Sequence, residues 1–168
     1  NPRSKLRRIT KWTGHWAGVV NGTTDGKRLV FMRWSWQSDV FVGDWEAKGH
    51  RLKNPRRLTF DERQDFLSCW TRDSKAVLFS SDRNGQFDIF KQALDQETAE
   101  PFVTGPGNKY GPVLSPDGNL ILYLQEVAGG KIRIMRVPIS LGAPEMVLEG
   151  EIDVMRCSSF PATRCVLG

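Results

Sequence analysis

An internal repeat limits the fold of this chain more than any other feature of its sequence. A short polar turn occurs three times, around Asp25, Asp73 and Asp117, so the aspartates are 48 and then 44 residues apart. Each turn is followed by an apolar run, a polar gap, a second run that alternates between apolar and polar residues, and a shorter closing segment. Four strand signals in a period of about 45 residues are typical of a four-stranded propeller blade.

The sequence therefore predicts an all-β chain that forms a partial β-propeller ring of about three and a half four-stranded blades. Asn84-Gly85 lies between two strand signals, which is a strong indication of a hairpin. The apolar runs at 76–79 and 120–124 do not alternate, as expected for strands that are covered on both faces.

We expect a single propeller-type domain over residues 1–168. Its expected parts are a closing strand of a preceding blade at 1–10, a first blade at 15–60, a second at 65–104, a third at 110–149, and the first half of a further blade at 152–168. The ends do not complete blades, which indicates either a fragment of a larger ring or association between chains. The start at Asn1, without a Met or a signal peptide, suggests a processed or excised chain.

The motifs of the repeat resemble the TolB-type propeller repeat. The resemblance depends on Ser115-Pro116-Asp117-Gly118 before an apolar strand, and on the turn at 80–85 followed by Asp88-Ile89-Phe90. TolB-type repeats are related to the tryptophan–aspartate repeats and to the propellers of prolyl oligopeptidases. The first repeat departs from the pattern, because residues 21–24 replace the usual Ser-Pro. The resemblance extends over about residues 15–168 and implies the fold without a function.

We expect a non-catalytic module for protein or ligand recognition, belonging to a larger bacterial sensory, regulatory or envelope protein. The chain has no Gly-x-Ser-x-Gly motif, and its two histidines, His15 and His50, are too few for the usual His-based metal sites or a catalytic relay. We therefore expect no enzymatic activity, no cofactor and no metal. The alternative is the gating propeller of a serine peptidase of the prolyl oligopeptidase type, whose catalytic domain would lie elsewhere.

Propellers bind protein or small-molecule partners through the loops at one end of the channel. The candidates for such a binding surface are Trp36, Arg83, Asn84, Lys109 and Tyr110. Five of the six tryptophans lie within the first 45 residues. They could stack on sugars or bases, although packing between blades is the commoner use of such rings.

Asp82, Asn84 and Asp88 place oxygen ligands near a glycine. They lack the bidentate Glu that completes a calcium loop, and Asn84 and Gly85 are already explained by the turn. We therefore expect no calcium site there.

The basic residues form two clusters, within 3–11 and within 48–57. Such clusters can bind phosphate backbones or anionic lipid, but solvated loops and strand edges also carry Lys and Arg. No nucleic-acid motif accompanies them, so we do not expect a nucleic-acid partner. The longest apolar stretches are far shorter than a membrane-spanning helix, so no membrane span is expected.

The three cysteines include one pair of interest. Cys69 lies in an apolar strand, where we expect a buried and inert thiol. Cys157 and Cys165 flank a turn around Phe160-Pro161, and in a hairpin centred there they would face each other. They are either a disulfide or two small strand residues. A disulfide would favour an oxidising, periplasmic or otherwise extracytoplasmic location.

The incomplete ring has two flanks whose apolar residues lack the usual neighbouring blade. They include Trp12 and Trp16 at one end, and Val154, Met155, Val166 and Leu167 at the other. Exposed apolar faces and unpaired strand edges favour association. We therefore expect self-association through the first and last twenty residues. The segment 6–10 could pair with 157–167 within one chain or between two chains.

Overall fold

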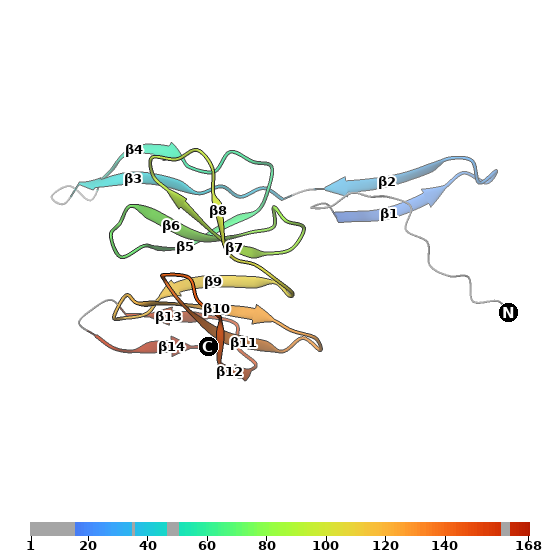
Figure 1. Cartoon of the computed structure of the whole chain (residues 1–168). Helices are drawn as coiled ribbons and strands as arrows, with labels where there is room; N and C mark the ends of the chain where they lie inside the picture. The colour runs from blue at the N-terminus through green and yellow to red at the C-terminus, as the bar shows by residue number, and fades with distance from the viewer. Residues whose placement is uncertain (1–15, 35, 47–50, 159–161) are drawn as a thin grey trace. The chain divides into compact units, whose positions relative to one another are not determined.

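The computed structural model describes residues 16–34, 36–46, 51–158 and 162–168 (Figure 1). The described residues form fourteen β-strands and no helix, which confirms the all-β prediction. The chain divides into two compact units, residues 1–36 and 37–168, and each is described by itself. The expected closing strand at 1–10 lies outside the described residues.

The first unit contains one antiparallel hairpin. Its strands are β1 (Trp16–Gly22) and β2 (Leu29–Trp34). The apolar side chains of Leu29, Val30 and Met32 are exposed.

The second unit consists of antiparallel sheets that follow one another along the chain (Figure 1). A two-stranded sheet contains β3 (Phe41–Glu46) and β4 (Arg51–Arg57). A four-stranded sheet has the order β5 (Asp65–Trp70), β6 (Ala76–Ser81), β7 (Asp88–Ala93), β8 (Glu100–Val103). The next has the order β9 (Lys109–Leu114), β10 (Leu120–Glu126), β11 (Ile132–Pro138), β12 (Glu145–Gly150). A last hairpin contains β13 (Met155–Cys157) and β14 (Cys165–Leu167).

The four-stranded sheets occupy the segments in which the repeat predicts the second and third blades. The segment expected to form the first blade, 15–60, is described as two hairpins, β1–β2 and β3–β4, one in each compact unit.

Strand β6 is buried on both faces, which explains why its sequence does not alternate. Val77 and Phe79 point to one side, where they pack in a core cluster with Val40 and Leu58 of the β3–β4 region. Leu78 points to the other side and shares a second cluster with residues of the β9–β12 sheet. That cluster consists of Leu78, Ile89, Val103, Ile121, Tyr123 and Val137. Stacking of successive sheets therefore builds the core, as in a propeller.

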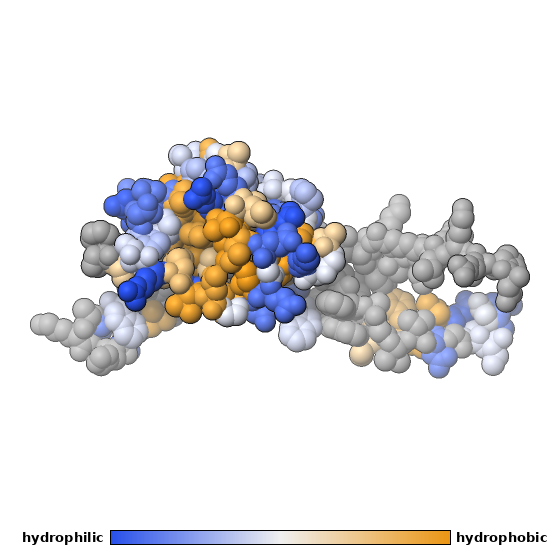
Figure 2. All heavy atoms as spheres, turned by 90° about the horizontal axis from the view of Figure 1, so that it is seen from below, coloured by the Kyte–Doolittle hydropathy of each residue, from blue (hydrophilic) through white to orange (hydrophobic). Residues whose placement is uncertain are grey.

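A third core cluster joins the β9–β12 sheet to the last hairpin. It contains Val113, Leu124, Ile134, Ile152 and Met155. Met155 is therefore buried, whereas the sequence analysis placed it on an exposed flank. The other apolar residues of the expected flank, Val154, Val166 and Leu167, are exposed. Three apolar residues of β12, Met146, Val147 and Leu148, are exposed as well. Figure 2, viewed from the side of β12 and β14 in Figure 1, shows apolar surface there in orange.

The turn between β5 and β6 is closed by its own side chains. Thr71 Oγ1 donates a hydrogen bond to Asp73 Oδ1 (2.6 Å) and accepts one from the backbone N–H of Ala76 (3.1 Å). Asp73 Oδ1 also accepts a hydrogen bond from the backbone N–H of Lys75 (3.2 Å). The Thr71 hydroxyl is the largest cause that holds the pKa of Asp73 below its ordinary value. Short polar side chains that form hydrogen bonds within their own turn stabilise it, which explains why Thr or Ser and Asp occur in this turn of each repeat.

The same network closes the turns of the other two repeats. Ser115 and Asp117 form it before β10, and Thr23 and Asp25 form it between β1 and β2. In each turn the hydroxyl is the largest cause that lowers the pKa of the aspartate. Thr23 therefore corresponds to Thr71 and Ser115 in the repeat.

Candidate ligand-binding groove

The first strands of three successive sheets, β5, β9 and β13, lie next to one another. In a propeller, the first strand of each blade borders the central channel. Residues of these strands line two neighbouring cavities, and both cavities are lined by Val113 and Arg156. We call them the aromatic cavity and the turn cavity, and together the inner groove.

The aromatic cavity has a volume of about 330 Å³. It is lined by Phe66, Leu67, Ser80, Tyr110, Gly111, Val113 and Arg156. Phe87, from the turn between β6 and β7, connects two of the aromatic side chains: its ring centroid is 5.4 Å from that of Phe66 and 5.1 Å from that of Tyr110. Such separations are typical of favourable aromatic pairs, so the three rings form one stack.

Three hydrogen-bond donors line the aromatic cavity. The Ser80 hydroxyl is fully buried (0% exposed) and has no hydrogen-bond partner in the part of the chain that the structure describes. Burial is the first cause that raises the pKa of Tyr110, and the nearby charge of Glu126 is the second, so the phenol stays protonated at neutral pH. Arg156 donates to the carbonyl of Met155 (2.9 Å) and forms no ion pair with any carboxylate of the described residues. The lining therefore carries one positive charge and no negative charge.

The turn cavity has a volume of about 450 Å³. It extends from Arg156 to the turns that begin at Thr71 and Ser115, and Cys69 lies in its wall. Burial raises the pKa of the Cys69 thiol to about 11, so this cysteine is a thiol rather than a thiolate at neutral pH. A reactive nucleophile is therefore not expected in this cavity.

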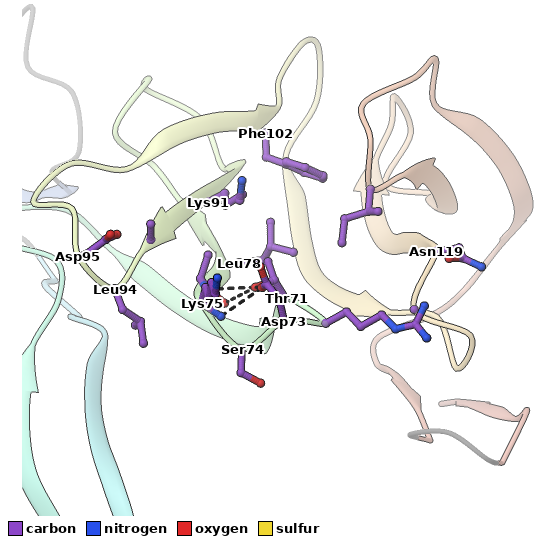
Figure 3. Close-up of a pocket in the computed structure, with 15 residues that line it drawn as sticks. Thr71, Asp73, Ser74, Lys75, Leu78, Lys91, Leu94, Asp95, Phe102 and Asn119 are labelled. Atoms are coloured by element: carbon purple, nitrogen blue, oxygen red, sulfur yellow. Dashed lines mark hydrogen bonds between the residues drawn. The ribbon is translucent and has the colours of Figure 1, made fainter.

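A further cavity, of about 810 Å³, lies between the β5–β8 and β9–β12 sheets (Figure 3). Figure 3 shows Thr71, Asp73 and Lys75 together in one turn, with Lys91 and Phe102 farther along the lining. Two of its charged groups have protein partners: Asp73 accepts the turn hydrogen bonds, and Lys91 Nζ lies 3.2 Å from Glu100 Oε1. A ligand there would compete with these bonds, so we regard the inner groove as the better candidate.

Of the five residues predicted for a binding surface, Trp36 and Asn84 are exposed, Arg83 and Tyr110 are half-buried, and Lys109 is buried. Trp36 is 69% exposed and belongs to the first unit. Tyr110 lines the aromatic cavity of the second unit. The structure therefore assigns a place in the inner groove to Tyr110 alone among the five.

Arg83 and Asn84 contact other parts of the protein. Arg83 Nη2 lies 3.0 Å from Asp61 Oδ2 and 3.2 Å from Asp65 Oδ1, and its guanidinium lies 4.5 Å from the ring centroid of Phe90. Asn84 donates to Asp88 Oδ2 (3.3 Å). These contacts hold the turn between β6 and β7 in place.

Lys109 is not on a surface. Its side chain is 2% exposed, and Nζ donates to Asp88 Oδ1 (2.9 Å) and to the carbonyls of Gly105 (2.6 Å) and Gly107 (2.8 Å). All three ammonium hydrogens have acceptors, so none is left for a ligand. Lys109 was predicted to lie on a binding surface, whereas the structure buries it. Its partner Asp88 lies on the preceding sheet, and the sequence alone does not show that the two residues meet.

Phe66, Ser80, Phe87 and Arg156 are not among the residues predicted from the sequence. Of these, only Arg156 could have been identified from the alternation of its strand. Met155 and Cys157, on either side of it, both pack against the third core cluster, so the side chain of Arg156 points to the opposite face of the strand. The other three are ordinary strand and turn residues until the sheets stack.

Cys157 and Cys165 are directly paired in the ladder of β13 and β14, and the structure joins them by a disulfide. Cys69 is a free cysteine. No described segment is a helix of the length and apolarity that crossing a membrane requires.

The second basic cluster lies on β4, except for Lys48, which is outside the described residues. Lys53 Nζ pairs with Glu46 (2.8 Å), and Arg57 Nη2 pairs with Asp39 (2.6 Å). These pairs fit a solvated strand edge better than a phosphate-binding face.

We predicted no metal site and no calcium site. The structure bears on this prediction only in part, because both histidines lie outside the described residues. Within the described part, no group of three or more His, Cys, Asp or Glu side chains is placed to hold a metal ion. Asp82 Oδ1 instead accepts the backbone N–H of Gln64 (3.0 Å).

Comparison with known proteins agrees with this architecture. No protein-family profile matches the chain. The uncharacterized protein Atu1656 of Agrobacterium fabrum is 27% identical over 93 residues, which are 55% of this chain and 31% of that protein.

Two solved structures are similar in fold. A "putative TolB" from Agrobacterium tumefaciens has a TM-score of 0.53 and 18% identity, covering 82% of this chain and 64% of that chain. TolB from Acinetobacter baumannii has a TM-score of 0.51 and 20% identity, covering 77% and 31%. A puromycin-hydrolyzing peptidase from Mycobacterium tuberculosis has a TM-score of 0.44 and 15% identity, covering 78% and 28%.

The chain spans less than two thirds of the length of each of these proteins. At these identities the two TolB structures bear on the fold alone. Together with the stacked antiparallel sheets, they confirm the prediction made from the repeat: the chain has the fold of TolB-type β-propellers and forms part of such a ring.

Proposed function

We propose that the chain is a non-catalytic recognition module that binds a small ligand or a protein segment in the inner groove. On this proposal it belongs to a larger bacterial sensory, regulatory or envelope protein. The observation that carries the proposal is the aromatic cavity, where aromatic rings lie beside the buried Ser80 hydroxyl, which has no hydrogen-bond partner among the described residues, and beside the guanidinium of Arg156.

The unpartnered Ser80 hydroxyl supports a binding role. A buried polar group without a partner costs about 1–3 kcal/mol of stability. An acceptor from a ligand would remove that cost. Phe66, Leu67 and Trp70 of β5 are exposed, and apolar side chains around a few polar groups are the usual lining of ligand sites.

The chemistry of the groove supports recognition rather than catalysis. Among the described residues, those that line the aromatic cavity include no carboxylate and no histidine that could act as a general base. The thiol of Cys69 in the turn cavity is kept protonated by burial. No feature of the described residues favours the alternative of a peptidase gating propeller.

A fragment screen tests the proposal. We expect fragments that bind the isotope-labelled chain to shift the backbone NMR signals of Tyr110, Gly111 and Arg156 together. Leu67→Trp would fill the aromatic cavity and should abolish these shifts. Leu52→Trp is the matched control, because Leu52 is equally exposed but lies on β4. Fragments that bind Leu67→Trp unchanged, or that shift no common set of signals, would contradict the proposal.

Labelling with an active-site-directed fluorophosphonate tests the absence of serine-based catalysis. We expect no serine of the folded chain to be labelled, and a chymotrypsin-type protease serves as the positive control. A serine labelled in the folded chain and spared in the denatured chain would show an activated nucleophile and would overturn the non-catalytic part of the proposal.

A further inference from the structure

We infer that the aromatic cavity binds the carboxylate of an aromatic or apolar ligand. In this site Arg156 is the anchor, and Ser80 and Tyr110 are additional hydrogen-bond donors. The inference rests on the proposed function and names the chemical class that the groove would take.

The charge of the cavity favours an anion. Arg156 is the one charged residue among those that line it. The carboxylates of Glu126 and Asp117 do not pair with Arg156: Glu126 Oε2 accepts from Asn108 Nδ2 (2.9 Å), and Asp117, which lines the turn cavity, accepts from Asn119 Nδ2 (2.9 Å). An anion in the aromatic cavity would therefore meet a guanidinium that forms no ion pair with the described carboxylates.

Arg156 has donors to spare. Nη1 donates to the carbonyl of Met155, which leaves the donors of Nε and Nη2 without a partner among the described residues. A guanidinium is planar and matches the two oxygens of a carboxylate with two parallel hydrogen bonds. This geometry favours a carboxylate over a single neutral acceptor.

Ser80 supplies a second donor, from strand β6. In β6, Leu78 and Ser80 are two residues apart and therefore share a face, and Leu78 packs against the β9–β12 sheet. Ser80 is also directly opposite Phe66 in the ladder, so the hydroxyl and the ring lie on the same side of the sheet. The buried hydroxyl thus lies between the aromatic stack and β9, with no acceptor of its own.

The remaining lining selects the rest of the ligand. Phe66, Leu67 and Val113 are apolar, and the stack of Phe66, Phe87 and Tyr110 offers an aromatic edge. A volume of about 330 Å³ is at the lower end for small-molecule sites, which suits one ring or one apolar side chain with its acid group. A phosphate would usually be met by several cations or backbone N–H groups, whereas this cavity has one guanidinium.

The test uses N-acetyl-L-phenylalanine and its amide as a matched pair of probes, titrated into the labelled full chain by NMR. We expect the acid to bind with a Kd of about 1 mM and the amide to bind at least about tenfold more weakly. Arg156→Gln should remove the preference for the acid and leave the weak binding of the amide unchanged. Arg164→Gln is the control, because Arg164 lies in the same hairpin and outside both cavities.

Ser80→Ala gives a second readout that is independent of Arg156. It removes an unpartnered buried hydroxyl, so the free protein should keep or gain thermal stability while the acid binds several-fold more weakly. A purely structural role for Ser80 would instead lower stability and leave affinity unchanged.

Equal affinity for the acid and the amide, or an Arg156→Gln variant that keeps the preference, would overturn the inference. Phenyl phosphate is the third probe, and tighter binding of phenyl phosphate than of the acid would replace carboxylate by phosphate as the ligand group. In each of these cases, neutral fragments that still shift the signals of the groove would leave the proposed function standing.

Discussion

Ser74 adopts a left-handed backbone conformation, with φ of 56°, in the turn between β5 and β6. Gly26 and Gly118 occupy the corresponding position in the other two repeats, with φ of 67° and 75°. A side chain makes this conformation unfavourable by about 1–2 kcal/mol, and glycine avoids that cost at a smaller loss of chain entropy.

We therefore expect Ser74→Gly to raise the free energy of unfolding by about 0.5–1 kcal/mol. Chemical denaturation of the purified chain measures the change, and Ser74→Ala, which keeps the strain, should give no gain. A Ser74→Gly variant that is less stable than the parent chain would mean that the Ser74 side chain contributes a contact worth more than the strain.

The buried pair of Lys109 and Asp88 predicts a strong asymmetry between single and double substitutions. Lys109→Met leaves the Asp88 carboxylate buried without its cation and should lower the free energy of unfolding by about 3–5 kcal/mol. Asp88→Leu combined with Lys109→Met should regain part of this loss, because both charges are then gone. Urea denaturation of the three proteins checks the order. Equal stability of the single and double variants would contradict a buried ion pair.

The turn aspartates predict a loss of stability in acid. The pKa of Asp73 is lowered in the folded chain, so its contribution is complete above the unfolded value, near 3.8, and is lost as the pH falls through the lower folded value. Thr71→Val removes the hydroxyl that is the largest cause of the shift. We expect the difference between the urea midpoints of the parent and Thr71→Val to be larger at pH 6 than below the folded pKa of Asp73, where only the pH-independent loss of the hydrogen bond between Thr71 and Ala76 remains. A difference that stays constant down to pH 2 would show that Asp73 is not involved.

At the scale of elements, the hairpin of β13 and β14 depends on its disulfide. Each of its strands has three residues, too few for a stable isolated hairpin. A crosslink across a loop of this size contributes about 2–3 kcal/mol by restricting the unfolded chain.

We expect the chain produced in an oxidising compartment to have an intact mass two hydrogens below that of the free dithiol, and one thiol, Cys69, that reacts with iodoacetamide after unfolding. Reduction should raise hydrogen exchange in the β13–β14 hairpin while the β5–β8 sheet keeps its protection. Alkylation of Cys157 and Cys165 without a reductant would contradict the disulfide.

At the scale of the whole molecule, the apolar surface of β12 and β14 predicts self-association. Val147 and Val166 are exposed there with other apolar side chains, and contiguous apolar surface of this kind promotes association. The part of the expected interface at residues 1–15 lies outside the described residues, so the test concerns the C-terminal surface.

We expect the apparent mass in sedimentation equilibrium to rise with protein concentration. Val166→Glu with Val147→Glu should restore a monomer, whereas Leu52→Glu on the exposed face of β4 should not. A parent chain that is monomeric over a hundredfold range of concentration would contradict the prediction.

The sequence by itself determined the repeat, the strands and the turns, because the interactions behind them are local. The hydroxyl of Thr71 reaches Asp73, two residues away, and the backbone N–H of Ala76, five residues away, so these residues can be recognised as a motif along the chain. The unalternating run in β6 likewise predicts burial on both faces without any knowledge of its neighbours.

The tertiary structure alone decided which polar residues are free to bind. Lys109 and Arg83 have the same appearance in the sequence as surface cations, but their partners Asp88 and Asp65 lie 21 and 18 residues away, on other strands. Arg156 is the reverse case: the stacked sheets bring it to Ser80 and Tyr110 in one cavity, and it forms no ion pair with any carboxylate in the described part of the chain. A charged side chain is free to bind a ligand only where no opposite charge of the protein lies within a few ångströms. The packing of the sheets determines the distance between the two charges.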